Sequence, residues 1–210
     1  NTATRDMSQL ILLDAAKVQA QDADRNNRRR LRRGDIPEQP LYDTDDVIKT
    51  VSSFQTLEYD QRKEVAQGIS ARLVDAGHML GSSSIELTVE ENGTTKVIAF
   101  SGDLGPRGAP FLRDPVPIPH ADLVLLESTY GDRNHQPLVE TLSEFRSIVL
   151  EAVANKGVIL VPVFAVGRAQ QMIYHLAALF RDKTIPSFPI YLDSPMAISA
   201  VNIYRRHTGL

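Results

Sequence analysis

The chain has 210 residues, of which 42% are hydrophobic and 23% charged, a composition typical of globular domains. Its formal net charge of −3 gives no overall basic character, so nucleic-acid binding would require a local basic patch or residues outside this chain. The absence of cysteine excludes disulfides and cysteine-rich zinc sites, favours a cytoplasmic protein, and leaves His, Asp and Glu as metal ligands. The longest apolar stretch, around residues 157–166, is too short to cross a membrane.

The first third of the chain is predicted to be helical and ends in a run of arginines. Apolar residues recur at helical spacing over residues 7–23, and six arginines fall within residues 25–33 before Gly34. One interpretation of this run is a solvated helix end that leads into a loop. The other is a patch that contacts phosphate groups. A second, short helix is expected from Asp43 to about Val51.

The middle of the chain has the pattern of β-strands. Residues 70–76 and 84–89 alternate between apolar and polar side chains, with a glycine-rich turn between them. The pair Asn92-Gly93 predicts a hairpin that joins the second of these strands to residues 96–100. After a proline-rich loop, the apolar run 123–126 predicts a strand buried on both faces.

The last part of the chain alternates between helical and strand patterns. We expect helices over 138–154 and 167–180, each followed by a strand, at 157–163 and 188–192. Such alternation predicts a parallel sheet with crossover helices. The change in pattern places a domain boundary near residue 136.

Three residues that can bind metals or move protons lie at the ends of predicted strands. His78 lies in a turn of small residues, Asp103 lies beside glycines, and Glu127 ends the apolar run. Each also has a structural interpretation: a histidine satisfied by its neighbours, an aspartate that bonds its own turn, and a carboxylate that, if buried, needs a partner. Together they suggest a shared rim, although position in the sequence does not show that these strand ends meet.

Several segments around these residues match, in order and spacing, motifs of one family. The chain resembles metallo-β-lactamase-fold RNA-processing enzymes that carry a β-CASP insertion, and in particular prokaryotic homologues of the endonuclease subunit that cuts messenger-RNA precursors before polyadenylation. The segments that carry the resemblance are TRDM at 4–7 with LLD at 12–14, AGHMLGSS at 76–83, FSGDLG at 100–105, ESTYG at 127–131, PVFAVGRAQ at 162–170 and YLDSPMA at 191–197.

The resemblance implies an α/β fold in two portions. Residues 1–135 are expected to form part of an αββα metallo-β-lactamase fold that lacks its N-terminal part, and residues 136–210 to begin a β-CASP α/β domain with a parallel sheet. The chain does not begin with Met, and the family's His-x-His-x-Asp-His stretch does not occur in it. These features predict an internal piece of a longer protein, which alone would bind zinc weakly and would not cleave RNA.

The resemblance also assigns roles to the three strand-end residues. His78 matches a ligand of one zinc ion, and Asp103 matches the aspartate that bridges two zinc ions. Glu127 matches the acidic residue of the first β-CASP motif, beside the metals, so Asp103 and Glu127 are the expected catalytic residues. The implied reaction is hydrolysis of RNA phosphodiester bonds by water that two zinc ions activate. His120, His135, His175 and His207 lie outside any matching motif, so each is expected to be structural or exposed.

Four further residues are candidates for substrate binding: Ser82, Ser83, Arg168 and Ser194. For the serines at 82 and 83 a role in a tight turn is the favoured interpretation. For Arg168, at a predicted helix start, a structural ion pair is the alternative to a phosphate contact. The expected partner is RNA, and a homodimer is compatible with the sequence. Two rival hypotheses are a non-catalytic RNA-binding or scaffolding member of the fold and a metallo-hydrolase of small molecules.

Overall fold

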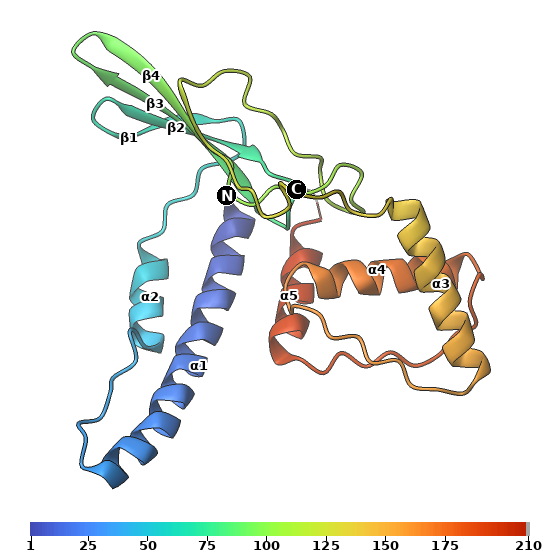
Figure 1. Ribbon diagram of the computed structural model, residues 1–210. Coiled ribbons are helices and arrows are strands. Elements are labelled where there is room, and N and C mark those ends of the chain that lie inside the picture. The colour runs from blue at the N-terminus through green and yellow to red at the C-terminus, as the bar shows by residue number, and fades with distance from the viewer. Residues whose placement is uncertain (209–210) are drawn as a thin grey trace.

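The computed structural model describes residues 1–208 and contains a β-sheet with two groups of helices beside it (Figure 1). Helices α1 and α2 run away from one end of the sheet as a pair, and α3, α4 and α5 form the second group. Along the chain the elements are α1 (Thr2–Arg33), α2 (Thr44–Ser52), β1 (Arg62–Ala66), β2 (Ile69–Asp75), β3 (Ser83–Glu91), β4 (Thr94–Phe100), β5 (Leu123–Leu125), α3 (Leu138–Ala154), α4 (Arg168–Arg181) and α5 (Pro195–Arg206).

The sheet has the strand order β1-β2-β3-β4-β5, which follows the chain. Neighbouring strands are antiparallel except for β4 and β5, which run parallel. The hairpin between β3 and β4 turns at Asn92 and Gly93, whose φ angles of 50° and 74° suit the tight turn that this residue pair favours. The mixed α/β class with a parallel strand pair is therefore confirmed.

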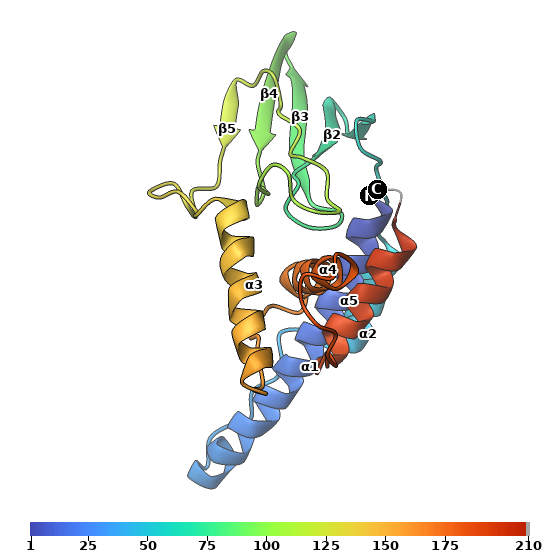
Figure 2. The same cartoon turned by 90° about the vertical axis from the view of Figure 1, so that its right-hand side faces the viewer.

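Strand β5 differs from its prediction. Its side chains were expected to be buried on both faces, but Leu123, Val124 and Leu125 are 55%, 57% and 46% exposed. The reason is its position: β5 is an edge strand that pairs with β4 on one side, and no helix of the described residues packs against it. Figure 2 shows β5 at the free edge of the sheet, above α3.

The prediction of strands at 157–163 and 188–192 is wrong for this structure. Neither segment forms a strand within residues 1–208, so the parallel pair β4–β5 lies outside the expected β-CASP portion. Both segments keep exposed apolar side chains, among them Val158 at 87% and Tyr191 at 87%. Their composition favours strands, but a strand also needs a paired neighbour, and none of the described segments pairs with them.

The helices α1 and α2 are stabilised in two ways: residues at their ends satisfy free backbone groups, and apolar residues on their facing sides pack together. Helix α1 ends at Gly34, which adopts the left-handed conformation (φ 80°) that lets the backbone amide reach the last carbonyls. Asp43 caps α2 through the amides of Asp45 and Asp46. Along its middle, α1 packs on α2 through a cluster of buried residues, Ala16, Val47 and Val51.

A second cluster joins the start of α1 to α5 and to the turn after β2. It contains Ala3, Met7, Leu80, Ala200 and Ile203. Because Leu80 follows β2 and Ala200 lies in α5, this core connects segments on both sides of the predicted boundary at residue 136. Because Leu80 is two residues after His78, the cluster is in direct contact with the turn that carries His78. A third cluster holds α3 against α4, through Val149 and Leu176.

No helix within residues 1–208 is both long enough and apolar enough to cross a lipid bilayer.

An ion-pair network lies on one face of the sheet, away from the strand ends. Glu86 on β3 is 5% exposed and lies opposite Arg72 on β2. Its carboxylate accepts hydrogen bonds from Arg72, at 2.5 Å, and from Arg62 on β1. Hydrogen bonds from Arg72 lower the pKa of the Glu86 carboxyl. The network ties three neighbouring strands together through one buried charge.

Removing this charge should weaken the sheet. We expect Glu86→Gln in the intact protein to lower the free energy of unfolding by about 2 kcal/mol at neutral pH, the scale of a hydrogen bond to a charged group. Because the folded-state pKa is lowered, the stabilisation is present above the unfolded-state pKa and is lost as pH falls through the folded-state pKa. Denaturant unfolding at several pH values measures this difference.

The exposed Glu91 at the end of β3 provides the matched control, since Glu91→Gln should change the stability little. Equal unfolding free energies for wild type and Glu86→Gln at neutral pH would contradict the role of the network.

Candidate functional site

The three candidate residues lie at the same end of the sheet, where the strands that precede them finish. Strands β2, β4 and β5 point in the same direction, because β3 is antiparallel to both β2 and β4, and β4 is parallel to β5. His78 follows β2, Asp103 follows β4 and Glu127 follows β5. The His78 Nε2 and Asp103 Oδ2 atoms are 3.8 Å apart, and both side chains are open to solvent. The rim inferred from the sequence therefore exists.

The turn that carries His78 is held by side chains of its own residues. The Asp75 carboxylate accepts the Gly77 amide at 2.8 Å. The Ser82 hydroxyl accepts the amides of His78 and Met79, at 3.1 and 3.3 Å. Ser82 thus acts in the turn, as one of the two interpretations of the sequence anticipated. Its neighbour Ser83 is half-buried and hydrogen-bonds the Gly81 carbonyl at 3.5 Å.

Glu127 holds the loop that carries Asp103. Its carboxylate accepts the Leu104 amide at 2.6 Å, and its own amide donates to the Ser101 hydroxyl at 2.9 Å. The Leu104 amide, followed by the Thr129 hydroxyl, lowers the pKa of the Glu127 carboxyl. The carboxylate is therefore ionised at neutral pH. It is not buried, because the preceding apolar run is itself exposed, and the Leu104 amide is its hydrogen-bond partner.

Gly105 brings this loop against the turn of His78. Its amide donates to the Ala76 carbonyl at 2.8 Å. A Cβ atom on Gly105 would lie 1.7 Å from the Gly77 carbonyl oxygen and 2.6 Å from the His78 nitrogen. No side chain fits at this position, so glycine permits the close approach of the two backbones. Gly105, Ser101 and the Leu104 amide were not among the residues predicted to form the site, although all three lie in the segment FSGDLG around Asp103.

The donor atoms of His78 and Asp103 suit a zinc ion. Imidazole nitrogen and carboxylate oxygen bind zinc at about 2.0–2.2 Å, which places two ligands of a tetrahedral ion about 3.4 Å apart. The observed separation of 3.8 Å is close to that value. Within residues 1–208 no group of three or more His, Asp or Glu side chains is arranged to hold a metal. Among the described residues, His78 and Asp103 therefore form a pair of possible ligands and no more.

Arg168 begins α4, close to this turn, and Ser194 precedes α5, whose opposite end contacts the turn through Tyr204. Gly167, before Arg168, approaches Met79: a Cβ on the glycine would lie 3.9 Å from the Met79 Cβ. Arg168 is exposed and donates to Gln171 at 3.0 Å, in place of the ion pair considered from the sequence. The Ser194 hydroxyl caps α5 by accepting the Ala197 amide at 3.1 Å.

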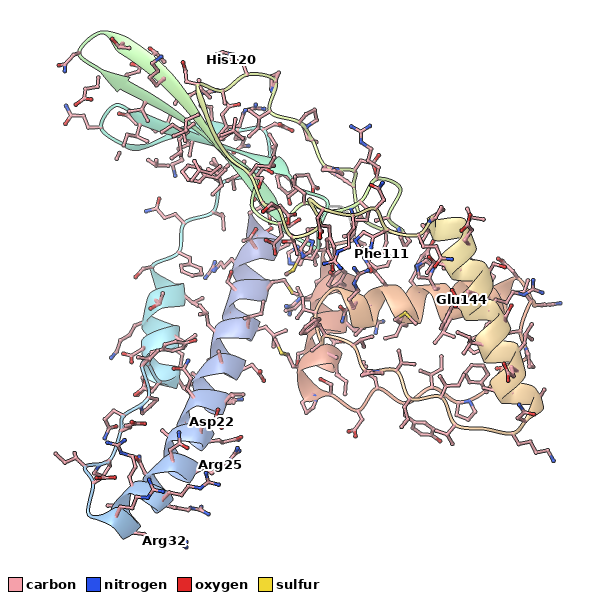
Figure 3. All side chains as sticks on the ribbon, in the orientation of Figure 1. Asp22, Arg25, Arg32, Phe111, His120 and Glu144 are labelled. Atoms are coloured by element: carbon pink, nitrogen blue, oxygen red, sulfur yellow. The ribbon has the colours of Figure 1, made fainter. Side chains whose placement is uncertain are left out.

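The His135 ring packs edge-on against Tyr130, three residues after Glu127, with ring centroids 4.2 Å apart. The other three histidines each have their own surroundings. The ring of His207 contacts the Asp6 carboxylate at 3.0 Å, which joins the end of α5 to the first turns of α1. His120 lies beside the sheet at the end away from the helices, as Figure 3 shows. His175 lies in α4. Its partial burial lowers the pKa of the imidazole and so favours the neutral form.

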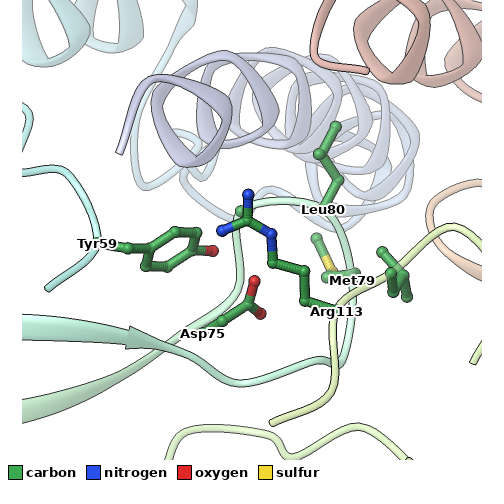
Figure 4. A pocket seen from close by; sticks show the side chains of 7 residues that line it. Tyr59, Asp75, Met79, Leu80 and Arg113 are labelled. Atoms are coloured by element: carbon green, nitrogen blue, oxygen red, sulfur yellow. The ribbon is translucent and has the colours of Figure 1, made fainter. Parts of the chain in front are cut away.

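A small cavity lies behind the turn of His78 (Figure 4). It has a volume of about 10 Å³ and is lined by Tyr59, Asp75, Met79, Leu80, Gly81, Leu112 and Arg113. This volume is the room of about one water molecule. Burial raises the pKa of Asp75, whose carboxylate supports the turn. The cavity is too small for a nucleotide.

The approach of Gly105 provides a test of the site geometry. We expect Gly105→Ala to force the 102–105 loop away from the turn and to separate Asp103 from His78, because the added methyl overlaps the Gly77 carbonyl. The intact protein should lose metal affinity by about tenfold or more, as when a group that orients a ligand is removed. Competition with a chelator measures the affinity.

The matched control is Gly157→Ala, since Gly157 lies in the segment after α3, has no left-handed φ, and a Cβ there would lie 3.4 Å from the Ala152 carbonyl oxygen, an ordinary contact. Unchanged metal affinity in Gly105→Ala, with normal folding, would show that this contact does not position the ligands.

Comparison with known proteins identifies relatives of this chain. Residues 169–210 match the family model described as the Beta-Casp domain. The chain is 38% identical over 171 residues to ribonuclease TTHA0252 of Thermus thermophilus, covering 81% of the chain and 38% of the relative. It is 31% identical over 175 residues to endoribonuclease ysh1 of Schizosaccharomyces pombe, covering 82% and 22%. It is also 30% identical over 208 residues to transcription termination factor FttA of Methanosarcina mazei, covering 97% and 30%.

The chain thus spans between 22% and 38% of the length of these three relatives. The match to ribonuclease TTHA0252 covers most of the chain, so the likeness extends well beyond the Beta-Casp segment. The mixed α/β fold with its parallel strand pair agrees with these matches. The chain belongs to the β-CASP family of the metallo-β-lactamase fold.

Proposed function

We propose that the intact protein is a zinc-dependent ribonuclease that hydrolyses phosphodiester bonds of RNA. The observation that carries the proposal is the 3.8 Å separation of His78 Nε2 and Asp103 Oδ2 on an exposed rim of the sheet. Two of the relatives are named as a ribonuclease and an endoribonuclease, which supports RNA as the substrate. An open rim also suits a polymer, because a polymer extends beyond the site in both directions.

In this proposal His78 would hold one zinc ion, and Asp103 would be shared between two. Bound zinc ions supply activation of water and stabilisation of the charge that develops on the phosphate. The chain's own residues orient these ligands: Ser82 fixes the backbone of His78, and Glu127 fixes the loop of Asp103 through the Leu104 amide. The contacts of Glu127 support a positioning role for the residue that the family resemblance places at the catalytic centre.

Three other candidates contribute to the proposal to different degrees. Arg168 is exposed at the start of α4, where a guanidinium and the helix end together favour a phosphate group. We propose it as an RNA contact. The hydroxyls of Ser82 and Ser194 already accept backbone amides, so they are less available to a substrate.

The variant Asp103→Asn tests the bridging role. Asparagine keeps the size of the side chain and removes the charge that two cations share, so we expect cleavage of end-labelled RNA to fall by more than about 100-fold. RNA affinity, measured with a chelator present, should stay within about twofold, since one exposed carboxylate contributes little to RNA binding. The lengths of the wild-type products distinguish cutting inside the RNA from removal of nucleotides at an end.

The control for this experiment is Asp35→Asn, an equal change at an exposed position in the loop after α1. It should cleave as the wild type does. Undiminished turnover by Asp103→Asn would rule out the bridging role. A wild-type protein that binds RNA but does not cut it with zinc present would support a binding or scaffolding member of the fold instead.

A further inference from the structure

The arginine run forms an exposed, basic end of α1. Figure 3 shows Asp22, Arg25 and Arg32 near the tip of this helix, far from the sheet. Six of the nine residues from 25 to 33 are arginines, in a chain whose net charge is −3. The run therefore concentrates positive charge in a protein that has no overall basic character.

The structure divides these arginines into two kinds. Arg30 donates to the Ile36 carbonyl at 2.8 Å and to the Glu38 carboxylate at 2.7 Å. Together with Asn27, it holds the loop after α1 against the helix. Arg30 thus has a structural role, which the sequence did not distinguish from that of its neighbours.

The other arginines lie on a different side of the helix. At about 100° per residue, positions 28, 29, 32 and 33 share one face, which also includes Arg25, and Arg30 lies outside it. Arg25 pairs with Asp22 at 3.6 Å. Within residues 1–208, the remaining four arginines form no ion pair or side-chain hydrogen bond and are exposed. We define the arginine face as Arg28, Arg29, Arg32 and Arg33.

Helix stability does not account for the arginine face. Like charges four residues apart, as at positions 28 and 32 or 29 and 33, destabilise a helix by about 0.2–0.5 kcal/mol per pair. The helix dipole stabilises positive charge near the C-terminal end of a helix, but that effect is confined to the last turn. Arg28 and Arg29 precede the last turn, whose basic residues are Arg30, Arg32 and Arg33. An anion bound to these arginines would neutralise their charges and offset this destabilisation of the helix.

We propose that the arginine face binds the phosphate backbone of the RNA substrate at a distance from the metal site. The inference rests on the proposed ribonuclease function and adds a second contact to it. Thr4 at the start of α1 donates to the Gly81 carbonyl in the turn of His78. Arg28 follows Thr4 by 24 residues, which at 1.5 Å per residue places it about 36 Å along the helix axis.

Helix α1 is thus a rigid arm between the turn of His78 and the arginine face. At about 3.4 Å per nucleotide in a stacked strand, RNA needs about 11 nucleotides to reach from one end of this arm to the other. A short oligonucleotide occupies the metal site alone, whereas a longer one contacts both. The arginine face therefore selects for long RNA and holds it after its first contact.

The chemistry of the face favours RNA over a protein partner. Stable protein interfaces have an apolar centre with buried aromatic or aliphatic anchors. From residue 21 to the end of α1, the side of the helix that bears the arginine face carries polar and charged side chains alone. Guanidinium groups bind phosphate through paired hydrogen bonds, and that contact needs no apolar support.

The test uses the intact protein with the four arginines of the face changed to glutamine. RNA binding is measured by fluorescence anisotropy with a chelator present, for oligonucleotides of four and twenty nucleotides over a range of salt concentrations. For the longer RNA we expect Kd to rise about tenfold or more, and the slope of log K against log salt to fall by about 3, at about 0.7 per phosphate contact. Cleavage of the four-nucleotide RNA should not change.

Two matched variants serve as controls. Changing the four arginines to lysine keeps the charge and should preserve most of the affinity. A second variant removes four positive charges elsewhere, at exposed residues without ion pairs within residues 1–208: Lys49, Lys156, Lys183 and Arg205, each changed to Gln. It should bind the longer RNA within about threefold of the wild type. Thermal unfolding of every variant checks that the fold is kept.

Unchanged affinity and salt slope in the glutamine variant would overturn the proposal. If that variant instead lost binding to polyglutamate, the face would be a site for an acidic protein, which also contradicts the proposal. The result is independent of the proposed function, because binding is measured without metal. A wild type that binds long RNA through the arginine face but never cuts it would refute the nuclease and leave this inference standing.

Discussion

The close approach of Gly105 to the turn at Gly77 and His78 is the contact on which the arrangement of the site depends. Two loops, one after β2 and one after β4, meet without a side chain between them. This contact sets how far the Asp103 carboxylate lies from the His78 ring. Glu127 then holds the same loop from the side of β5, through the Leu104 amide. Three strand ends thereby act as one rim.

The helices connect this rim with the rest of the molecule. Leu80, just after His78, is buried among residues from the start of α1 and from α5. Phe111, in the loop that follows Asp103, packs against Tyr174 of α4 and Tyr204 of α5. Both loops of the rim are therefore anchored on helices, and α1 extends from this anchor to the arginine face. In our proposal, α1 is the stiff element that joins the RNA contact at the arginine face to the zinc ligands.

Much of this arrangement could be predicted from the sequence, because local patterns determine it. The hairpin at Asn92-Gly93 and the placing of His78 and Asp103 at strand ends follow from alternation and turn residues. The exposure of β5 and the missing strands at 157–163 and 188–192 depend on which segments pair, which composition does not specify. The role of Gly105 depends on a contact between distant loops, and that of Arg30 on the direction of one side chain among six similar ones.

The central claim, that His78 and Asp103 share bound zinc, is tested most directly by the crystal structure of the intact protein grown with zinc. Data recorded on both sides of the zinc absorption edge locate the ions. The account predicts zinc at about 2.0–2.2 Å from His78 Nε2 and from an Asp103 carboxylate oxygen, with a second ion on the other oxygen. Zinc bound elsewhere, with both side chains free of metal in a folded protein, would contradict it.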